Sequence, residues 1–493
     1  SDAINACLKV AGLTINDIDE IAFANDLTYF LNEAYLKPAI ADYTRVKFLI
    51  DDIEKIKTSY EIENVIRENT GFTGEINFYL HHLCHVASAY YPSGFSEALI
   101  SSIDGIGEID TTMLAAGRDG EIEILHDGNR YPNSLGLIYS AITFFLGWKH
   151  HCDEGIIMGL APYGNPNAQI PGKDCTYLDI FKQIIIELDE YQFKINKDWI
   201  AYHLTRDVWV SEKFIEMFGS KRSYFDELTV HHKNIAAALQ LRIEQVVLNQ
   251  LRKARKQFGL KNLCIAGGVG LNCSLNGKIE SSAIFDEIFV QPASGDDGTA
   301  FGACLLAYKN SNSDLKPKKM HDFYKGPPST NEDIEKSIIE SKVKFDRLED
   351  IFTLTAEKLN EGKIIAWYQG GSEFGPRALG NRSILSRPFP ESMKDHLNER
   401  VKFREYFRPF APAVLKEYTF EYFSITQESP HMLIACKVNK DKRAIIPAVV
   451  HIDGSCRVQT VSSENNYRFY KLLNAFNELT SIPVLLNTSF NVK

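Results

Sequence analysis

Residues 81–108 read HHLCHVASAYYPSGFSEALISSIDGIGE, and this stretch decides how the middle of the chain folds. Its second half contains an apolar run at residues 98–103, which predicts a buried β-strand. The run ends at Asp104 and a glycine-rich turn, and residues 113–117 and 121–127 are predicted to be the hairpin partners of the strand. The first half is predicted to be a helix.

Strands and helices alternate on both sides of this stretch. Residues 234–258 have the pattern of a long amphipathic helix that ends in a basic turn before Gly259, and residues 262–266 form a strand after it. Further along, residues 351–360 are predicted to be a helix and residues 364–368 a strong buried strand. Such alternation indicates an α/β architecture.

Two domains are expected, because 493 residues exceed what one ordinary hydrophobic core organises. Residues 309–319 are polar and rich in turn formers, which predicts a loop or linker. We place the boundary near residue 340, giving domains 1–340 and 341–493. The chain is expected to begin and end inside a fold, because no strand precedes its first helix and residues 482–487 form a buried strand near its end.

The composition describes a globular protein with no nucleic-acid or membrane partner. The formal net charge of −10 argues against nonspecific binding to nucleic acid. No apolar run approaches the ~20 residues of a membrane span, and no signal peptide opens the chain. Nine scattered cysteines without a CxxC pair favour reduced thiols, so we expect a cytoplasmic protein.

A metal site is predicted from two histidines and two acidic passages. On a helix, His81 and His85 lie one turn apart on the same face, while Cys84 turns away from it. Asp104 stands at the end of a strand beside glycine amides, and Asp296 precedes a helix of small residues. Imidazoles with carboxylates suit Fe(II), Mn(II) or Zn(II), and the spacing does not choose among them.

Two glycine turns are candidate nucleotide contacts. Residues 266–272, AGGVGLN, follow a predicted strand and open a helix, where glycines allow a nucleoside or phosphate to approach the backbone. The spacing is not GxGxxG, so a dinucleotide is disfavoured, and a purely structural turn is the alternative. Residues 104–112, DGIGEIDTT, have the acidic turn and threonine-rich strand of the phosphate hairpin in the actin, sugar-kinase and Hsp70 fold. Residues 155–164 are predicted to be a buried turn that walls the same cleft.

Six cations of the second predicted domain lie among turn formers and apolar side chains. They are Arg377, Arg382, Lys402, Arg404, Arg408 and Arg457. Guanidinium groups match phosphate and carboxylate oxygens in pairs, so several in one cleft could neutralise a triphosphate or carbamoyl phosphate. The alternative is solvated surface charge, which the alternating aromatic residues of 402–412 disfavour.

Taken together, these motifs resemble the NodU/CmcH O-carbamoyltransferase family. The matching segments run in order along nearly the whole chain: residues 81–90 (HHLCHVASAY), 104–108 (DGIGE), 158–164 (MGLAPYG), 267–272 (GGVGLN), 295–300 (GDDGTA), 373–380 (EFGPRALG), 404–412 (REYFRPFAP) and 487–491 (NTSFN). Each motif alone is weak, whereas the ordered set is specific.

The resemblance implies a fold and an activity. The N-terminal domain is expected to be similar to the Kae1-type member of the actin-like fold, and the C-terminal domain to the YrdC/Sua5 twisted α/β sheet. The YrdC-like domain would form carbamoyl adenylate from carbamoyl phosphate and ATP, with Mg²⁺ accompanying ATP. The Kae1-like domain would then transfer the carbamoyl group to a hydroxyl of a small-molecule acceptor, expected to be a secondary metabolite that the sequence does not identify.

The resemblance also implies a role for individual residues. The metal ligands would be His81, His85, Asp104 and Asp296, with iron, as Fe(II), the expected metal. The adenosine contacts would be Gly267, Gly268 and Asn272. The phosphate and carbamoyl ligands would be Arg377, Lys402, Arg404, Arg408 and Arg457, of which Arg377 and Lys402 are also expected to be catalytic. Ser489 and Asn491 resemble the closing loop of YrdC domains, and His82 is the candidate base for the acceptor hydroxyl.

Two departures from the family pattern bear on activity. The usual first strand, with its His-Asp-Ser-like loop, is not in this chain, and Ile156 and Ile157 stand where relatives often have a lysine. Three other functions remain open at this point: a tRNA threonylcarbamoyl-type modification enzyme, a nucleotide-binding module without catalysis, and a metallohydrolase that needs no ATP.

Overall fold

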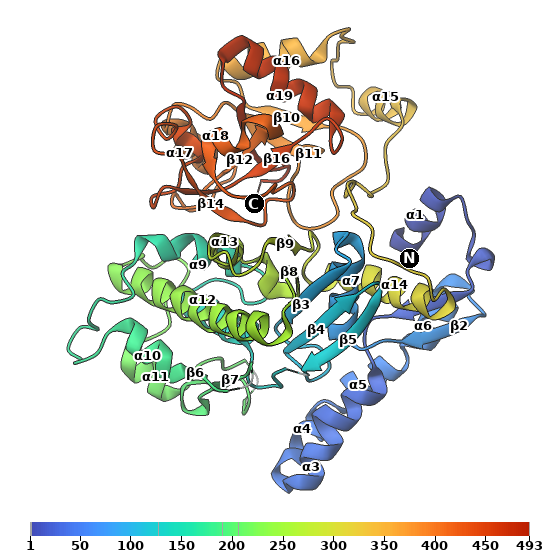
Figure 1. Cartoon of the computed structure of the whole chain (residues 1–493), viewed down its shortest axis with the longest axis vertical. Coiled ribbons are helices and arrows are strands. Elements are labelled where there is room, and N and C mark those ends of the chain that lie inside the picture. Colours follow the sequence, from blue (N-terminus) through green and yellow to red (C-terminus); the bar gives the residue numbers. More distant parts are fainter. Residues whose placement is uncertain (1, 127, 190, 206, 493) are drawn as a thin grey trace.

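A five-stranded mixed sheet forms the centre of the lower body in Figure 1. The computed structural model describes residues 2–126, 128–189, 191–205 and 207–492. The strands lie in the order β5-β4-β3-β8-β9, with bounds β3 Glu97–Ile103, β4 Thr112–Arg118, β5 Glu121–His126, β8 Asn262–Ala266 and β9 Glu287–Val290. The predicted hairpin partners are confirmed, because β3 pairs antiparallel with β4 and β4 with β5. Asp127, the predicted last residue of that hairpin, lies outside the described residues.

Helices cover both faces of this sheet, as the alternation of apolar side chains along β3 requires. Ile100 packs into a core with helices α7, His81–Ser93, and α14, Thr299–Ser311. Its neighbour Leu99 points to the opposite face, where α8, Leu135–Phe145, and α12, Val230–Phe258, fill the larger core. The α/β architecture predicted from the sequence is therefore confirmed.

A second five-stranded mixed sheet lies in the upper body of Figure 1. Its order is β10-β11-β17-β12-β16, with bounds β10 Ile365–Tyr368, β11 Arg382–Ser386, β12 Ala411–Leu415, β16 Gln459–Val461 and β17 Val484–Ser489. Helices α16, Ile351–Asn360, and α19, Tyr467–Thr480, pack on it through a separate core. A smaller sheet holds β13 Phe423–Ser424, β14 Ala435–Val438 and β15 Ser455–Arg457, and helices α17 Ser392–Arg400 and α18 Thr419–Tyr422 complete this body.

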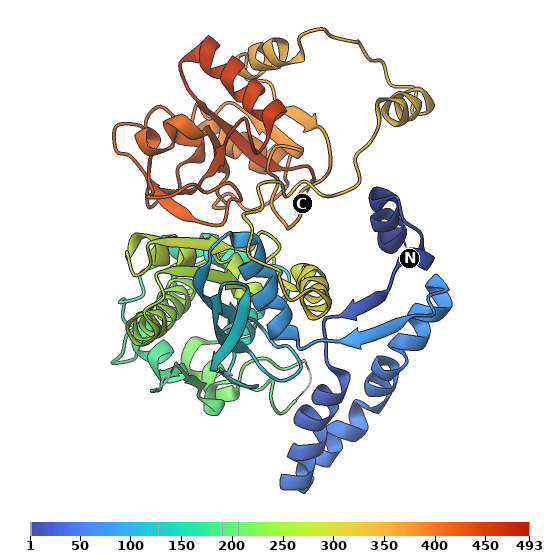
Figure 2. The same ribbon diagram turned by 45° about the vertical axis from the view of Figure 1, so that its right-hand side comes forward.

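The remaining elements lie outside the two five-stranded sheets and the helices named so far, and α15 is drawn beside the upper body in Figure 1. They are α1 Asp2–Ala11, β1 Glu20–Phe23, α2 Leu27–Phe30, α3 Lys37–Ala41, α4 Val46–Asp51, α5 Ile53–Tyr60, α6 Ile62–Thr70, β2 Glu75–Phe78, α9 Glu154–Leu160, α10 Tyr177–Ile184, β6 Ile185–Glu187, β7 Phe193–Ile195, α11 Glu212–Phe218, α13 Cys273–Ser281 and α15 Asn331–Glu340. Figure 2 shows the helices of residues 27–70 projecting from the lower body as an arm. Among the described residues, no helix has the length and apolar character needed to cross a membrane.

Three local predictions were wrong. Residues 309–311 are the last turn of α14 rather than loop, because the helix keeps its hydrogen bonds through polar residues. Residues 364–368 do not form a buried strand: β10 is an edge strand, and Trp367 is its one buried side chain. Residues 155–164 are mostly helical, in α9 and a 3₁₀ turn, rather than an open turn.

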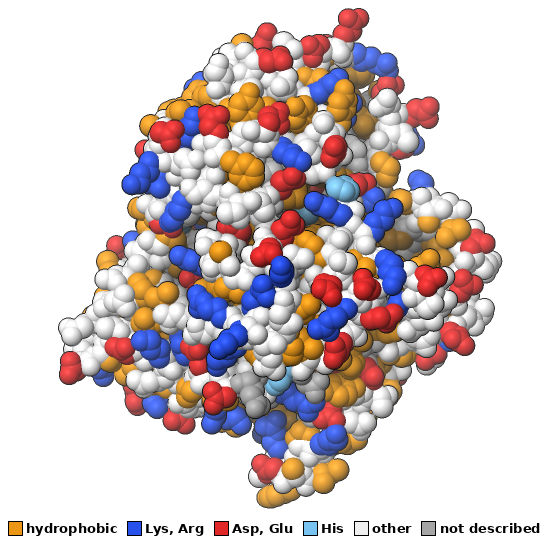
Figure 3. All heavy atoms as spheres, in the orientation of Figure 1, with side chains coloured by type: hydrophobic (Ala, Val, Ile, Leu, Met, Phe, Trp, Pro, Cys, Tyr) orange, Lys and Arg blue, Asp and Glu red, His pale blue; other side chains and the backbone are white. Residues whose placement is uncertain are grey.

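The two bodies contact each other through hydrogen bonds and apolar packing. Glu280 in α13 accepts hydrogen bonds from the backbone and hydroxyl of Thr426, both at 2.6 Å. The amide of Gln427 exchanges two hydrogen bonds with the backbone of Ile288. Side chains of both bodies share one continuous core. Figure 3 shows acidic and basic side chains interspersed over the face that it displays, without a large area of one sign.

Candidate active site

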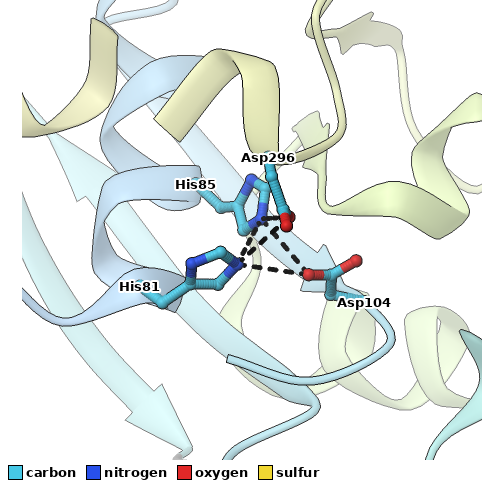
Figure 4. Close-up of side chains that lie close together, drawn as sticks. All are labelled: His81, His85, Asp104 and Asp296. Atoms are coloured by element: carbon cyan, nitrogen blue, oxygen red, sulfur yellow. Dashed lines mark hydrogen bonds and ion pairs between the residues drawn. The ribbon is translucent and has the colours of Figure 1, made fainter. Parts of the chain in front are cut away.

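Four predicted metal ligands converge at the carboxyl end of β3 (Figure 4). His81 and His85 come from the first turns of α7, Asp104 follows β3, and Asp296 precedes α14. His81 Nε2 lies 3.0 Å from His85 Nε2, 3.2 Å from Asp104 Oδ2 and 3.4 Å from Asp296 Oδ1. One ligand atom from each residue lies within 4.8 Å of the others.

The electrostatics of this cluster suit a cation. Burial lowers the pKa of His81, but hydrogen bonds and charge from Asp104 and Asp296 outweigh burial and raise that pKa to about 10. Burial raises the pKa of Asp104, yet hydrogen bonds from His81 and His85 hold it well below its usual range. The second oxygen of Asp104 accepts a hydrogen bond from the Gly268 amide at 2.8 Å, which orients the carboxylate toward the imidazoles. Two imidazoles and two carboxylates are a donor set that fits a divalent transition metal.

Glu108 fixes the start of the helix that carries both histidines, and sequence reasoning missed it. Leu80 precedes the helix and offers no side-chain cap. The buried Glu108 carboxylate takes that place: its Oε1 accepts hydrogen bonds from the backbone amides of His81, at 3.0 Å, and Asp26, at 2.8 Å. Nothing in the sequence indicated this role, because Glu108 is 27 residues away from His81.

His82, the predicted base for an acceptor hydroxyl, is enclosed by the core. His82 is 1% exposed. Its Nδ1 lies 2.8 Å from the Ser102 hydroxyl and its Nε2 lies 2.9 Å from the carbonyl oxygen of Asp110. Burial and the nearby His85 lower its pKa to about 3. Both ring nitrogens are therefore engaged inside the core, and the role of His82 as a base stays a prediction.

The glycine turn after β8 packs directly against the end of β3. Gly267 has a φ of 86°, and a Cβ there would lie 2.2 Å from the carbonyl oxygen of Ile103, so only glycine fits. Asn272 is less free than predicted. Its amide oxygen accepts the Leu275 amide at the start of α13, and its amide group exchanges hydrogen bonds with Gln240.

A cavity of about 730 Å³, the metal-side cavity, opens beside the cluster. Its wall includes Asp104, Tyr139, Glu154, Gly268, Asn272 and Asp296. A second cavity of about 230 Å³, the arginine cavity, lies against the second sheet. Its wall includes Arg404, Asp453, Cys456, Arg457, Thr488 and Ser489. The two cavities share Gly155, Met158, Pro376, Arg377 and Arg408, so they meet at a common junction.

Several positive charges gather in the arginine cavity and repel one another. Burial and then the charges of Arg457 and Arg408 lower the pKa of Arg377 to about 9. Burial and the same kind of repulsion, from Arg408 and Arg457, lower the pKa of Arg404 to about 9 as well. A guanidinium stays protonated at neutral pH, so these shifts express how unfavourable the cations are without an anion. The buried Nε atoms of Arg377 and Arg457 have no hydrogen-bond partner among the described residues. The cavity is therefore suited to an anionic ligand.

Lys402 lies beside this cavity rather than in its wall, which its predicted role did not anticipate. Burial and the charges of Arg404 and Arg408 lower its pKa to about 8. Its Nζ donates hydrogen bonds to the carbonyl oxygens of Ser489 and Asn491, both at 2.7 Å, and to their side chains at 3.1 and 2.7 Å. Lys402, Ser489 and Asn491, all predicted to bind ligand, are thus hydrogen-bonded to one another. Of these three residues, only Ser489 lines the arginine cavity.

Arg382 does not belong with the other cations. Its guanidinium lies 3.6 Å from the ring centroid of Tyr368 and donates to the carbonyl oxygens of Gln369, Gly370 and Asn381. It lines neither cavity. The expectation that it gathers in one cleft with the other cations was wrong, because the arginine is used to close the loop between β10 and β11.

The chain is similar to proteins of one family along most of its length. A family model described as Carbamoyltransferase N-terminus matches residues 1–305, and one described as Carbamoyltransferase C-terminus matches residues 356–493. An uncharacterized protein of Synechocystis is 36% identical, over 100% of this chain and 85% of that protein. The nodulation protein NolNO of Sinorhizobium fredii is 36% identical, over 99% of this chain and 69% of its own length.

Two further similarities complete the comparison. The nodulation protein NolO of Bradyrhizobium diazoefficiens is 39% identical, over 83% of this chain and 72% of its own length. Among solved structures, full-length HypF in the phosphate- and nucleotide-bound form aligns with a TM-score of 0.28 and 14% identity, over 50% of this chain and 46% of that chain. That structural similarity is too low to support an argument about fold or function.

Proposed function

The chain belongs to the carbamoyltransferase family and is an enzyme of that class, and we propose that it is an ATP-dependent O-carbamoyltransferase. In the first step, carbamoyl phosphate, ATP and water give carbamoyl adenylate, pyrophosphate and phosphate. In the second step, the hydroxyl oxygen of a small-molecule acceptor attacks the carbamoyl carbon. The bond from that carbon to the AMP oxygen breaks, so the products are the carbamate ester, AMP and a proton.

We propose that the chain divides near residue 340 into domains 1–340 and 341–493. The first would be the Kae1-like, actin-like domain that transfers the carbamoyl group, and the second the YrdC-like domain that forms the adenylate. The two five-stranded sheets, each with its own strand order and its own covering helices, are consistent with this division.

The first step is assigned to the arginine cavity. Arg377, Arg404, Arg408 and Arg457 would bind the phosphates of ATP and carbamoyl phosphate, with Mg²⁺ accompanying ATP. An anion there removes the repulsion that lowers the pKa of Arg377 and Arg404. The same cations would stabilise the negative charge that develops on the phosphate oxygens as pyrophosphate leaves.

The second step is assigned to the metal-side cavity. His81, His85, Asp104 and Asp296 would hold one divalent ion, with Fe(II) the metal expected from the family resemblance. The bound ion would supply Lewis-acid stabilisation of negative charge on a phosphate or carbonyl oxygen. Gly268 and Asn272 line this cavity and would contact the adenosine of the intermediate.

One observation supports both steps together: Arg377 and Arg408 line both cavities. An intermediate formed on one side can therefore reach the other while its phosphate stays beside a guanidinium, and it need not dissociate into water between steps. Keeping a reactive mixed anhydride bound limits its hydrolysis and holds it in a productive orientation.

The test is carbamoyl-phosphate-dependent release of pyrophosphate from ATP. The metal-loaded protein is expected to release pyrophosphate when carbamoyl phosphate is present and not when it is omitted. Replacing Arg377 with Ala should abolish the release, while Lys394→Ala in α17 should not change it. A folded wild-type protein that releases no pyrophosphate would exclude the adenylation step and leave a binding module.

A further inference from the structure

Glu405 contacts both Trp148 and Arg408 and so connects the walls of the two cavities. Glu405 Oε1 accepts a hydrogen bond of 2.7 Å from the indole Nε1 of Trp148. Glu405 Oε2 lies 3.6 Å from a terminal nitrogen of Arg408. One carboxylate therefore touches the first body through the indole and the junction of the cavities through the arginine.

Trp148 is a rigid support for this carboxylate. The indole is 4% exposed and packs edge-on against Phe407, with ring centroids 6.2 Å apart. On its other side the guanidinium of Arg222 lies 4.7 Å from the indole centroid. Arg222 is itself fixed, since it donates hydrogen bonds to the carbonyl oxygens of Leu146, Tyr224 and Asp226. The indole N–H consequently points at Glu405 from a site with little freedom to move.

The residues that follow Trp148 in sequence line the junction of the two cavities. His151, Cys152, Asp153 and Glu154 line the metal-side cavity, and Gly155 and Met158 line both cavities. The chain after Glu405 reaches Arg408 three residues later. The hydrogen bond between Trp148 and Glu405 thus joins two chain segments that both contribute residues to the junction.

Arg408 needs such an anchor more than the other cations do. Its side chain is 31% exposed, whereas Arg377 donates a hydrogen bond to the carbonyl oxygen of Leu271 at 3.4 Å and Arg404 is held by Asn398 at 2.8 Å and by the ring of Phe410. A long, partly exposed arginine samples many rotamers unless a carboxylate orients it. Glu405 is the carboxylate that lies close enough to the Arg408 guanidinium to orient it.

We propose that Glu405, anchored by Trp148, is a positioning residue that orients Arg408 across the junction and so retains the phosphate-bearing intermediate as it passes from the arginine cavity to the metal-side cavity. This inference rests on the proposed two-step function. It assigns Glu405 and Trp148 no contact with the reacting atoms. Loss of the contact should let the intermediate escape into water, where carbamoyl adenylate and water give carbamate and AMP.

The experiment measures pyrophosphate release over time with ATP, Mg²⁺ and carbamoyl phosphate and without any acceptor. The wild-type protein should give a burst of one pyrophosphate per active site and then a slow steady rate, because the intermediate stays bound. Trp148→Phe keeps the ring packing and removes the N–H donor, and Glu405→Gln keeps an acceptor for Trp148 and removes the charge opposite Arg408. Each variant should keep the burst and raise the steady rate about tenfold, the change expected when Trp148→Phe removes one hydrogen bond to a charged group and Glu405→Gln removes one partly buried ion pair.

The matched control is Gln427→Ala, which breaks two hydrogen bonds between the same two bodies but lies in neither cavity. It should change neither the burst nor the steady rate. The double variant Trp148→Phe/Glu405→Gln should raise the steady rate no more than the larger single change, because both act through one contact. Unchanged steady rates in both single variants, or a smaller burst in both, would overturn the proposal. Linear release without a burst in the wild-type protein would also overturn it, because the intermediate would then not be retained. A wild-type protein that releases no pyrophosphate at all would exclude the two-step function itself, which is a different result.

Discussion

The Nε2 atoms of His81 and His85 face each other at 3.0 Å across one turn of α7. Two neutral imidazoles cannot approach in this way through two lone pairs without repulsion, so a proton or a metal ion must lie between them. Two carboxylate oxygens converge on the same point and favour either occupant. A metal ion satisfies all four atoms at once, whereas a proton satisfies two.

Metal binding is the first expected consequence. The protein should bind one divalent ion per chain, and saturating metal at 100 times its Kd should add about 2.7 kcal/mol to the free energy of unfolding. Metal analysis after gel filtration and thermal unfolding with and without a chelator measure both quantities. His85→Ala should lose the ion and the thermal shift, while the exposed His396→Ala keeps both. Equal metal content in the two variants would place the ion elsewhere.

Arg377 is expected to lower the stability of the ligand-free protein while supporting pyrophosphate release. Its guanidinium lies beside two other arginines, and its buried Nε has no partner among the described residues, so its charge costs stability in the absence of ligand. Arg377→Met should raise the melting temperature by about 2 °C or more. The same change should lower pyrophosphate release by about 100-fold or more, because a cation aimed at developing charge is lost. Differential scanning calorimetry and the pyrophosphate assay measure the two effects on one sample.

Arg382→Met is the contrasting variant for that test. Arg382 donates to three backbone carbonyls and lines neither cavity, so its loss should destabilise the fold by about 1–3 kcal/mol and leave the pyrophosphate rate per folded molecule unchanged. The two arginines are five residues apart in sequence and should respond with opposite signs. A drop in melting temperature for Arg377→Met would show that the charge at that site is compensated.

Lys402 should control the order of the last residues of the chain. Its ammonium makes hydrogen-bond contacts with four oxygen atoms of Ser489 and Asn491, which share its three N–H groups. Lys402→Met removes all four, so the amides of residues 488–492 should exchange with deuterium at least about tenfold faster. Lys394→Met in α17 should leave that exchange unchanged. If protection at residues 488–492 survives in Lys402→Met, this segment is held by strand pairing alone.

Much of the fold could be predicted because many helices and strands are indicated by the residues within and next to them. The apolar run that ends at Asp104 and the basic turn before Gly259 mark the ends of β3 and α12 through burial pattern and capping chemistry. The convergence of His81 and His85 follows from helical spacing alone. Whether a strand lies at the edge or the centre of a sheet could not be predicted in the same way. The composition of β10 resembles that of a central strand, and only the strand order shows that one side of it is unpaired.

The roles of charged residues were harder to predict, because the groups that a charged side chain contacts in the fold are often far from it in sequence. Arg382 and Arg377 stand in similar sequence surroundings, yet one meets carbonyl oxygens and the other meets arginines. His82 has the same neighbours in sequence as His81 but faces the core. Glu405 lies inside a motif that the sequence singled out, and its bond to Trp148, 257 residues away, has no local signature.

Glu108 provides the last prediction, because it supports the metal site without touching the metal. Its carboxylate is the acceptor for the His81 and Asp26 amides, which no other side chain caps among the described residues at that helix end. Glu108→Ala should let the first turn of α7 fray and weaken metal binding by about 10- to 100-fold. Glu108→Gln keeps a carbonyl oxygen in the same place and should restore most of the affinity, and the exposed Glu123→Ala should have no effect. Titration of the metal-free protein with metal measures the affinities; equal losses for Glu108→Ala and Glu108→Gln would mean that the charge of Glu108, and not its capping oxygen, supports the site.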